Sequence, residues 1–284
     1  MITKQEDWNE RLTLLKILTR YNEVDKNQVT ETAINTAKDI VLRNVPRISV
    51  IMPMWNRQHI VTKAIKSVLA QTFRPYELII SDDGSEDGSV ETVENSFPKE
   101  IEAGLIKIIK NKENKGAAHA RNLGQQLATG DLIAYLDSDN QWRKNYLLMM
   151  AGLFAEEPDL NCAYAGLFVT NKDKNKQYIL AKPYNRARLL SGNFIDMNVF
   201  MHRCSLIDRL GGFNVDIERI EDWEMILRYT KEQIPPMLPM VGTNYLIDTE
   251  NLGNMSTTRD YTENFKKVYD IHRQEMEQYR IKAR

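Results

Sequence analysis

The sequence predicts an α/β fold with a mostly parallel central sheet flanked by helices. Three short apolar runs, at residues 48–52, 77–81 and 132–136, each lead directly into polar residues. Between the first two runs, apolar residues recur at helical spacing over residues 60–69. A strand, a helix and a second strand of these lengths form a βαβ unit, which is right-handed almost without exception. We therefore expect the polar residues that follow the strands to meet at one edge of one sheet.

Two amphipathic helices are predicted ahead of the first strand, at residues 7–21 and 27–43. Pro46 then ends the helical region and opens the sheet. Such a pair can dock a partner or a membrane surface. We expect it instead to pack on its own domain, because amphipathic stripes usually face a core. The apolar face of the second helix consists of Val29, Ala33, Ile34, Ala37, Ile40 and Val41.

The composition limits the class of protein. With 284 residues, the chain is long enough for one α/β domain with appendages and a buried core. Its 38 basic and 39 acidic residues nearly balance, and this gives no sign of a nucleic-acid partner. Cys162 and Cys204 have no metal-ligand or redox spacing, so we expect two small buried residues and a reducing compartment.

No signal peptide and no membrane-spanning helix are predicted. The N-terminus carries Glu6, Asp7 and Glu10 in place of a basic start and an apolar core. The longest apolar run, residues 146–155, has about half of the roughly 20 residues that a spanning helix requires. We expect a cytoplasmic protein, and peripheral association with the inner face of the membrane stays open.

Two acidic clusters follow the predicted strands. Asp137 and Asp139 stand one residue apart directly after the run at 132–136, and Asp82 and Asp83 follow the run at 77–81. In open α/β sheets, ligands gather at the carboxyl ends of strands. Hard oxygen ligands there suit Mg²⁺ or Mn²⁺, which bridge a protein to phosphate oxygens. Asp-Ser-Asp alone is equally typical of a surface turn, but the second cluster favours a ligand site.

Several ordered motifs resemble one known family. Their order and spacing are similar to those of the inverting family-2 glycosyltransferases of the GT-A fold, over about residues 47–230. Gly211-Gly212-Phe213 followed by Glu221-Asp222-Trp223 is similar to the acceptor-side motif of that family. The remaining blocks are Ile48-Ser49-Val50-Ile51-Met52-Pro53, Ser67-Val68-Leu69-Ala70-Gln71-Thr72, Asp82-Asp83-Gly84-Ser85, Asn114-Lys115-Gly116-Ala117-Ala118-His119-Ala120-Arg121-Asn122 and Asp137-Ser138-Asp139.

The resemblance implies a GT-A fold, in which a Rossmann-like nucleotide-binding half merges with an acceptor-binding half. The corresponding segments are an N-terminal helical extension at 1–45, a nucleotide-sugar-binding half at 46–142, an acceptor-binding half at 143–250, and a C-terminal loop and helix at 251–284.

The resemblance also assigns the Asp-Ser-Asp triplet to the metal and the donor. In the family the last Asp of this D-x-D motif contacts the metal directly, which points to Asp139 with Asp137 in support. The first Asp more often meets the sugar or the ribose, and Ser138 lies between the two carboxylates. Mg²⁺ keeps several waters and uses one or two carboxylates, so a complete protein cage is not expected.

Nucleotide recognition is expected at the ends of the first two strands. Asp83 matches a carboxylate that accepts from the base, which fits a uracil N3–H, whereas Asp82 has the character of a structural residue. Trp55 stands where the family commonly has Tyr, and its ring could stack on a base or lie in the core. Arg121 matches the Ala-Arg-Asn block and could face the diphosphate or be a solvated charge. Pro53 and Asn56 shape the same loop as Trp55.

Inversion by direct displacement needs a base for the acceptor hydroxyl. Asp222 is the candidate, because Glu221-Asp222 matches the acidic pair of the family and the second member is usually the base. Glu221 is the competitor, and a helix start favours acidic residues in any protein. Met201-His202-Arg203 resembles a segment near the diphosphate in some relatives, so His202 is a candidate metal or phosphate ligand, with a structural histidine as the alternative. Residues 253–259 are expected to form a mobile lid or an ordinary surface loop.

The resemblance implies a metal-dependent inverting glycosyltransferase that uses Mn²⁺ or Mg²⁺. It would move a sugar from a nucleotide diphosphate donor, expected to be a UDP-sugar, to a hydroxyl of a glycan, lipid-linked or other acceptor in bacterial-type surface polysaccharide synthesis. The alternative is a non-catalytic nucleotide-sugar sensor or scaffold, which would lose the metal site or the base. Asp139 and Asp222 are both present, and this favours an enzyme.

Overall fold

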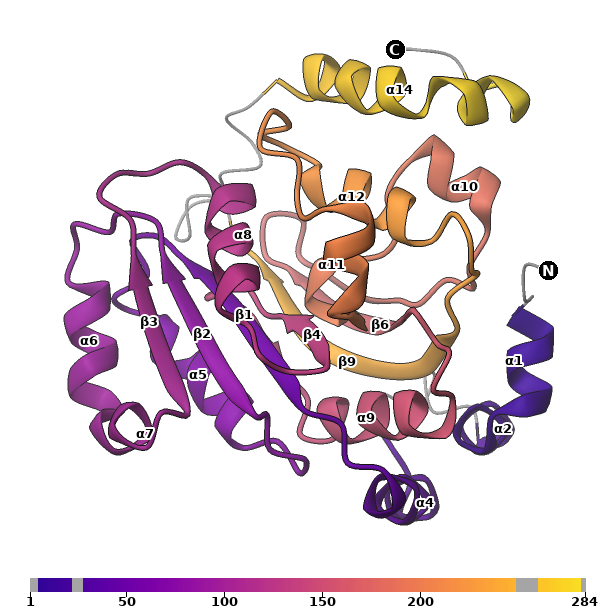
Figure 1. Ribbon diagram of the computed structural model, residues 1–284, viewed down its shortest axis with the longest axis horizontal. Helices are drawn as coiled ribbons and strands as arrows, with labels where there is room; N and C mark the ends of the chain where they lie inside the picture. The colour runs from indigo at the N-terminus through magenta and orange to yellow at the C-terminus, as the bar shows by residue number, and fades with distance from the viewer. Residues whose placement is uncertain (1–4, 22–27, 249–259, 282–284) are drawn as a thin grey trace.

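The computed structural model describes residues 5–21, 28–248 and 260–281, which form one curled sheet with helices on both faces (Figure 1). Within these residues the sheet has nine strands, in the order β3-β2-β1-β4-β8-β6-β9-β5 with β7 paired to β6. The predicted α/β class is confirmed. The strands are β1 (Ile48–Met54), β2 (Glu77–Asp82), β3 (Ile106–Lys110), β4 (Leu132–Tyr135), β5 (Gln141–Trp142), β6 (Cys162–Asn171), β7 (Lys176–Leu180), β8 (Phe200–Arg203) and β9 (Met237–Ile247).

Helices cover both faces of the sheet and bury a core on each. They are α1 (Gln5–Arg11), α2 (Thr13–Tyr21), α4 (Glu31–Arg43), α5 (Val61–Leu69), α6 (Ser89–Ser96), α7 (Pro98–Glu102), α8 (Ala117–Leu127), α9 (Tyr146–Glu156), α10 (Arg186–Ser191), the 3₁₀ helix η1 (Met197–Val199), α11 (Ser205–Leu210), α12 (Glu221–Tyr229) and α14 (Tyr261–Gln278). Val50 and Met52 of β1 enter a core with α4, α5 and α9, whereas Ile51 enters a core with α10, α12 and α14. This alternation follows from the two-residue period of a strand.

The predicted βαβ unit is present as β1, α5 and β2. β1 pairs in parallel with β2 and with β4, and β2 pairs in parallel with β3. β1 and β2 are buried along almost their whole length, as expected for parallel strands covered on both faces. β1 runs past its predicted end to Met54, and β4 stops before its predicted end, at Tyr135.

The N-terminal helices pack on the rest of the chain, which confirms the expected packing on their own domain. α4 lies against α9 below the sheet (Figure 1), and the backbone of Gly152 approaches Ala37 closely. The prediction of one helix at 7–21 is wrong, because the chain forms α1 and α2 with a break at Leu12. The Glu156 carboxylate of α9 accepts a hydrogen bond from the Thr13 amide at 2.7 Å, so a distant residue caps the second helix.

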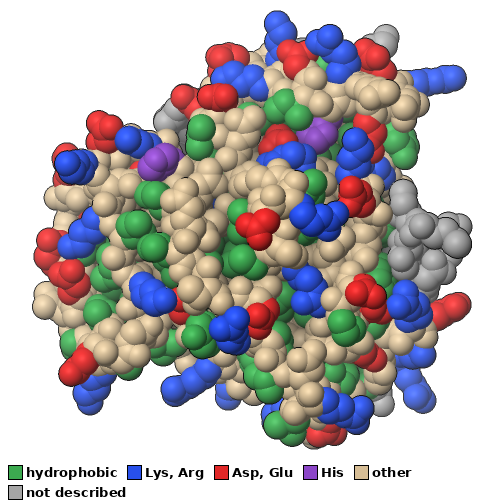
Figure 2. Space-filling model, in the orientation of Figure 1, with side chains coloured by type: hydrophobic (Ala, Val, Ile, Leu, Met, Phe, Trp, Pro, Cys, Tyr) green, Lys and Arg blue, Asp and Glu red, His purple; other side chains and the backbone are tan. Residues whose placement is uncertain are grey.

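The longest apolar run forms the buried helix α9. In the described ranges no helix is long and apolar enough to cross a membrane. Cys162 is buried on β6, as predicted, but Cys204 is only partly buried. The prediction for Cys204 is wrong because this residue stands at the turn between β8 and α11. On the face shown in Figure 2, acidic and basic side chains are interspersed, in agreement with the balanced composition.

Glu77 joins three segments at the amino-terminal edge of the parallel strands. Its carboxylate accepts hydrogen bonds from Ser49 Oγ at 2.5 Å, Lys107 Nζ at 2.5 Å and the Thr129 amide at 2.7 Å, and its side chain is 1% exposed. Burial acts to raise the pKa of Glu77, but the bonds from Lys107, Ser49 and Thr129 together lower it below its ordinary value. The charged carboxylate therefore stabilises the fold.

We expect Glu77→Gln to lower the free energy of unfolding by about 1–3 kcal/mol at pH 7, because buried donors lose a charged acceptor. The lowered pKa means that the parental stabilisation is complete above the unfolded pKa of Glu, about 4.3, and is lost as the pH falls through the folded value. The difference between the two proteins should therefore shrink in acid. Urea unfolding of both proteins at pH 7 and at pH 4 measures this difference in the free energy of unfolding. Glu94→Gln, which removes an exposed pair with Lys110, is the control and should change little.

Candidate active site

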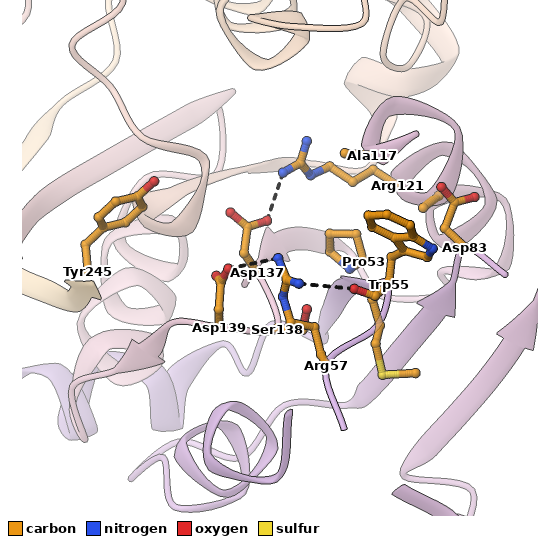
Figure 3. A pocket seen from close by; sticks show the side chains of 12 residues that line it. Pro53, Trp55, Arg57, Asp83, Ala117, Arg121, Asp137, Ser138, Asp139 and Tyr245 are labelled. Carbon is orange, nitrogen blue, oxygen red and sulfur yellow. Dashed lines mark hydrogen bonds and ion pairs between the residues drawn. The ribbon is translucent and has the colours of Figure 1, made fainter. Parts of the chain in front are cut away.

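The carboxyl ends of β1, β2 and β4 meet at one edge of the sheet, as the sequence predicts. The parallel register pairs Met54 with Asp82 and Ile51 with Tyr135, so the loops after the three strands converge. They form a cleft of about 180 Å³ that is open to solvent. The predicted residues that line it, drawn in Figure 3, are Pro53, Trp55, Asp83, Arg121, Asp137, Ser138 and Asp139.

Asp83 fixes the loop that leads into α8. Its buried carboxylate accepts from the Asn111 side-chain amide at 2.9 Å, from the Lys115 amide at 3.0 Å and from the Gly116 amide at 2.7 Å. Gly116 has φ +94°, a conformation that favours glycine, and stands directly before the start of α8. Since each oxygen of Asp83 is already within reach of two donors, a base N–H would have to replace one of them.

Trp55 is half-buried on the wall of the cleft, close to Asp83 (Figure 3). The alternative of a core aromatic is therefore wrong, and a ring face is available for stacking.

Asn56 and Asp82 hold loops together and lie outside the lining of the cleft, in agreement with the loop-shaping role expected for Asn56 and the structural role expected for Asp82. Asn56 has φ +50°, donates its amide to Ser85 Oγ at 2.8 Å and accepts from the Glu86 amide at 3.0 Å. Asp82 accepts from the Ser85 amide at 3.1 Å. The two residues join the β1 loop to the β2 loop through Ser85 and Glu86, which explains why polar residues are needed there.

Asp137 and Asp139 present their carboxylates to the same cleft. Asp137 accepts from Arg121 Nη2 at 2.8 Å and from Asn198 Nδ2 at 3.0 Å. Asp139 accepts from Asn140 Nδ2 at 3.1 Å and lies 3.5 Å from Arg57 Nη2. Burial raises the pKa of Asp139, the charge of Asp137 raises it further, and Arg57 opposes both. The raised pKa of Asp139 thus reflects burial first and the neighbouring Asp137 carboxylate second.

This donor set fits a divalent cation. Two hard carboxylates one residue apart face open space, and a cation between them would relieve their repulsion. In the part of the chain that the structure describes, no three His, Cys, Asp or Glu side chains lie close enough to hold a metal. A cation at Asp137 and Asp139 would therefore complete its coordination with water and with donor phosphate oxygens.

Arg57 belongs to the cleft, and sequence analysis did not identify it. Its guanidinium donates to the Trp55 carbonyl at 3.2 Å with one nitrogen and reaches Asp139 with the other (Figure 3). The only signal was its position in the polar segment after the first strand.

Arg121 bridges two carboxylates. Its side chain is 7% exposed, and it donates to Asp137 at 2.8 Å and to Glu221 at 2.7 Å. Its guanidinium also lies 5.3 Å from the Phe213 ring centroid. Burial acts to lower the pKa of Arg121, but the charges of Asp137 and Glu221 raise it above its ordinary value. Arg121 is therefore not a solvated charge. Its guanidinium, which was expected to face the diphosphate, already makes ion pairs with Asp137 and Glu221.

His202 is buried in the core, and its expected role as a metal or phosphate ligand is wrong. β8 runs antiparallel to β4 and pairs His202 with Ile133, about 13 Å along the strand from Asp137. The ring nitrogens contact the Tyr135 hydroxyl at 2.8 Å and the Arg203 carbonyl at 2.8 Å. Burial lowers the pKa of His202 to about 4, so the ring is neutral at physiological pH. The alternative of a structural histidine is confirmed.

A second cavity adjoins the cleft and shares Ala117, Arg121, Asp137 and Tyr245 with it. Asp222 lines this cavity, accepting from Asn193 Nδ2 at 3.1 Å and from the Trp223 amide at 2.7 Å. Burial raises the pKa of Asp222 to about 7, helped by the charge of Glu221 and opposed by Arg121.

Glu221 and Asp222 thus differ in environment. Glu221 is ion-paired with Arg121, whereas Asp222 faces the second cavity without a cationic partner at hydrogen-bond distance. A general base must reach the acceptor hydroxyl, so the position of Asp222 suits this role better than that of the ion-paired Glu221.

Asp196 and Asn198 form a second connection between the two cavities that the sequence analysis missed. Asn198 Nδ2 donates to Asp137 and, at 2.8 Å, to Asp196. Burial raises the pKa of Asp196 to about 6, and the charge of Asp137 adds to the shift. These residues belong to no motif, and only the fold brings them to Asp137. The predicted lid, Gly253 to Arg259, lies outside the described residues.

Comparisons with known proteins agree with this arrangement. Residues 49–210, more than half of the chain, match the family model described as Glycosyl transferase family 2. The chain is 26% identical over 232 residues to the UDP-Glc:alpha-D-GlcNAc-diphosphoundecaprenol beta-1,3-glucosyltransferase WfgD of Escherichia coli, covering 79% of this chain and 84% of WfgD. It is 30% identical over 200 residues to the putative colanic acid biosynthesis glycosyl transferase WcaA of Escherichia coli K12, covering 69% of this chain and 70% of WcaA.

Among solved structures, the fold is similar to that of S. aureus TarS 1-349 in complex with UDP-GlcNAc. The TM-score is 0.66 at 20% identity, and the match covers 84% of this chain and 68% of that one. The chain spans 64% of another TarS 1-349 chain and 39% of the chain in a further TarS structure. The likeness confirms the predicted GT-A fold.

Proposed function

We propose that this chain, which belongs to glycosyl transferase family 2 and is a glycosyltransferase, moves a sugar from a UDP-sugar to a hydroxyl group with inversion and with help from a divalent cation. One observation carries the proposal. The cleft with Trp55, Asp83 and the two carboxylates of the triplet opens into the cavity that holds Asp222, so donor and acceptor sites adjoin.

The donor nucleotide is assigned to the cleft. Trp55 offers a ring face to the base, and Asp83 accepts the uracil N3–H in place of one of its present donors. Asp139, supported by Asp137, would hold Mg²⁺ or Mn²⁺, which stabilises negative charge on a leaving diphosphate when it is bound. Residues 46–142 then supply the donor half and residues 143–250 the acceptor half. Tyr245, from the second segment, also forms part of the wall of the donor cleft.

The acceptor is assigned to the second cavity. Its hydroxyl oxygen forms the new bond to the anomeric carbon, the bond from that carbon to the diphosphate breaks, and the proton passes to the Asp222 carboxylate. Arg121 keeps Asp137 and Glu221 in place on the two sides of the boundary between the cavities.

The names of two relatives support a proposal for the acceptor class. WfgD is named for transfer to a GlcNAc-diphosphoundecaprenol and WcaA for colanic acid biosynthesis. We therefore assign this chain a lipid-linked saccharide acceptor in bacterial-type surface polysaccharide synthesis. With an acceptor of this kind, we propose that the enzyme works in the cytoplasm, at the inner face of the membrane.

Calorimetry tests the donor site. The parental protein should bind UDP more tightly with Mn²⁺ than without. It should also bind UDP more tightly than GDP, because the contacts of Trp55 and Asp83 are assigned to a pyrimidine ring with an N3–H. Asp139→Asn should lose the metal-dependent part of the affinity and keep the fold, because a neutral amide is a poorer ligand for a hard cation. Asp131→Asn, at the opposite end of β4, is the matched control and should bind like the parental protein.

Two results would count against these assignments. Undiminished metal-dependent affinity in Asp139→Asn would remove the metal site, and a clear preference for GDP would remove the base contacts. Transfer of a radiolabelled sugar from UDP-Glc or UDP-GlcNAc to GlcNAc-diphosphoundecaprenol then tests the acceptor class directly.

A further inference from the structure

The C-terminal helix α14 packs across α12, the helix that begins with Glu221 and Asp222 (Figure 1). The Phe265 ring lies 5.4 Å from the Trp223 ring, and both belong to the same buried core. Arg186 of α10 makes two hydrogen bonds of 2.7 Å to Glu275 and fixes the far end of α14. The helix is therefore held at both ends, and it lies outside residues 49–210, the part that matches the family model.

Asn264, one turn into α14, contacts the chain just ahead of α12. Its side chain is buried, and its Oδ1 accepts from the Glu218 amide at 2.9 Å and from the Arg219 amide at 3.4 Å. Its Nδ2 donates to the Asp260 carbonyl at 2.8 Å, which orients the amide group. Asn264 therefore fixes two successive peptide groups of a loop that belongs to another part of the chain.

The next residue of that loop, Ile220, is strained. It has φ +64° and ψ 21°, a left-handed conformation that is rare for a β-branched side chain. Such strain persists only where the surroundings over-determine the backbone. Asn264 holds the residues before Ile220, and Trp223 is held after it by the Phe265 contact and by a 2.6 Å hydrogen bond to the Leu189 carbonyl. Glu221 and Asp222 lie between these two fixed points.

We propose that Asn264 is a positioning residue, which holds the Glu218–Arg219 peptides so that the strained turn at Ile220 aims Asp222 into the second cavity. The role rests on the proposed function of Asp222. Asn264 itself does not line either cavity, so it acts through the loop and touches neither substrate.

Steady-state kinetics of Asn264→Ala with a UDP-sugar and a lipid-linked acceptor tests the role. We expect kcat to fall by about 10- to 100-fold, since a displacement near 1 Å at the reacting groups costs about 10²-fold. The donor KM should stay within about twofold, because the donor cleft is untouched. Asn264→Asp keeps an acceptor oxygen for the Glu218 and Arg219 amides but loses the donor to the Asp260 carbonyl, so it should recover part of kcat.

Hydrogen exchange followed by mass spectrometry gives a readout that does not depend on activity. Amides 218–220 should exchange faster in Asn264→Ala than in the parental protein, while α14 stays protected. Lys267→Ala is the matched control, because Lys267 also joins α14 to this loop, at the Asp216 carbonyl, without touching the two amides. It should keep the parental kcat.

The outcomes separate this inference from the proposed base. If Asp222→Asn is inactive while Asn264→Ala transfers at the parental rate, the base stands and the positioning role is overturned. Equal losses in Asn264→Ala, Asn264→Asp and Lys267→Ala would also overturn it, because they would show general loosening of α14. If Asp222→Asn transfers at the parental rate, the proposed base itself is wrong.

Discussion

Asp222→Asn should lose most of the transfer activity, by about 10²–10⁴-fold, and keep the donor affinity of the parental protein. Asp222 lies in the second cavity and does not line the donor cleft, so binding and turnover should separate. The amide can still accept the 2.7 Å hydrogen bond from the Trp223 amide, which should preserve the start of α12. Donor calorimetry and transfer to a verified acceptor, measured on the same preparation, give the two quantities.

The pH dependence follows from the same residue. A general base acts in its ionised form, and burial raises the pKa of Asp222 to about 7. Parental kcat should therefore rise about tenfold per pH unit below pH 7 and level off above it. Glu221→Gln provides the comparison, because Glu221 is paired with Arg121 and does not face the cavity freely. If this variant alone abolishes transfer while Asp222→Asn does not, the base is Glu221.

The parallel half of the fold was predictable because local signals and topology agree there. Strands rich in β-branched residues, a helix at the right spacing and polar strand ends define a βαβ unit, and parallel pairing then brings Asp83 and Asp137 to one edge. Arg121 was identified because it belongs to an ordered motif, and Trp55 because it stands where the family commonly has Tyr, two residues after another motif. The sequence does not show which residues contact them, so the ion pairs of Arg121 with two carboxylates were not predicted.

The errors lie where long-range contacts decide the structure. His202 was misplaced because nothing local reveals that β8 runs antiparallel to β4 and carries the histidine away from Asp137. The break at Leu12 depends on the Glu156 carboxylate, more than a hundred residues away. Asp196 and Asn198 reach Asp137 only through the sheet topology, and no spacing in the sequence signals their proximity.

Arg121→Met should lower both the free energy of unfolding and the donor affinity. Removing the guanidinium leaves Asp137 and Glu221 without their shared cation. We expect the free energy of unfolding to fall by about 3 kcal/mol. This is at the low end of the range for breaking a buried ion pair, because the side chain of Asp137 is 29% exposed. Arg186→Met removes another buried ion-paired arginine, away from the cleft. This control should lose a comparable free energy and keep the parental affinity for UDP.

The double variant Arg121→Met/Glu221→Gln identifies the cause of that loss. If the Glu221 carboxylate destabilises the fold once Arg121 is gone, removing its charge should restore part of the free energy of unfolding. The effects of the two substitutions on that free energy should then not be additive. Additive losses in urea unfolding would show that packing against Phe213, 5.3 Å from the guanidinium, matters more than charge.

Donor binding by Arg121→Met separates two roles of the guanidinium. Both of its terminal nitrogens make ion pairs, one with Asp137 and one with Glu221. If Arg121 acts by orienting Asp137, the variant should lose UDP affinity mainly in the presence of Mn²⁺, since only the metal-dependent part passes through that carboxylate. If Arg121 instead leaves its partners to contact the diphosphate, affinity should fall equally with and without the metal. The tight pairing of Arg121 favours the first result, because a direct phosphate contact would first have to break an ion pair that is buried on the arginine side.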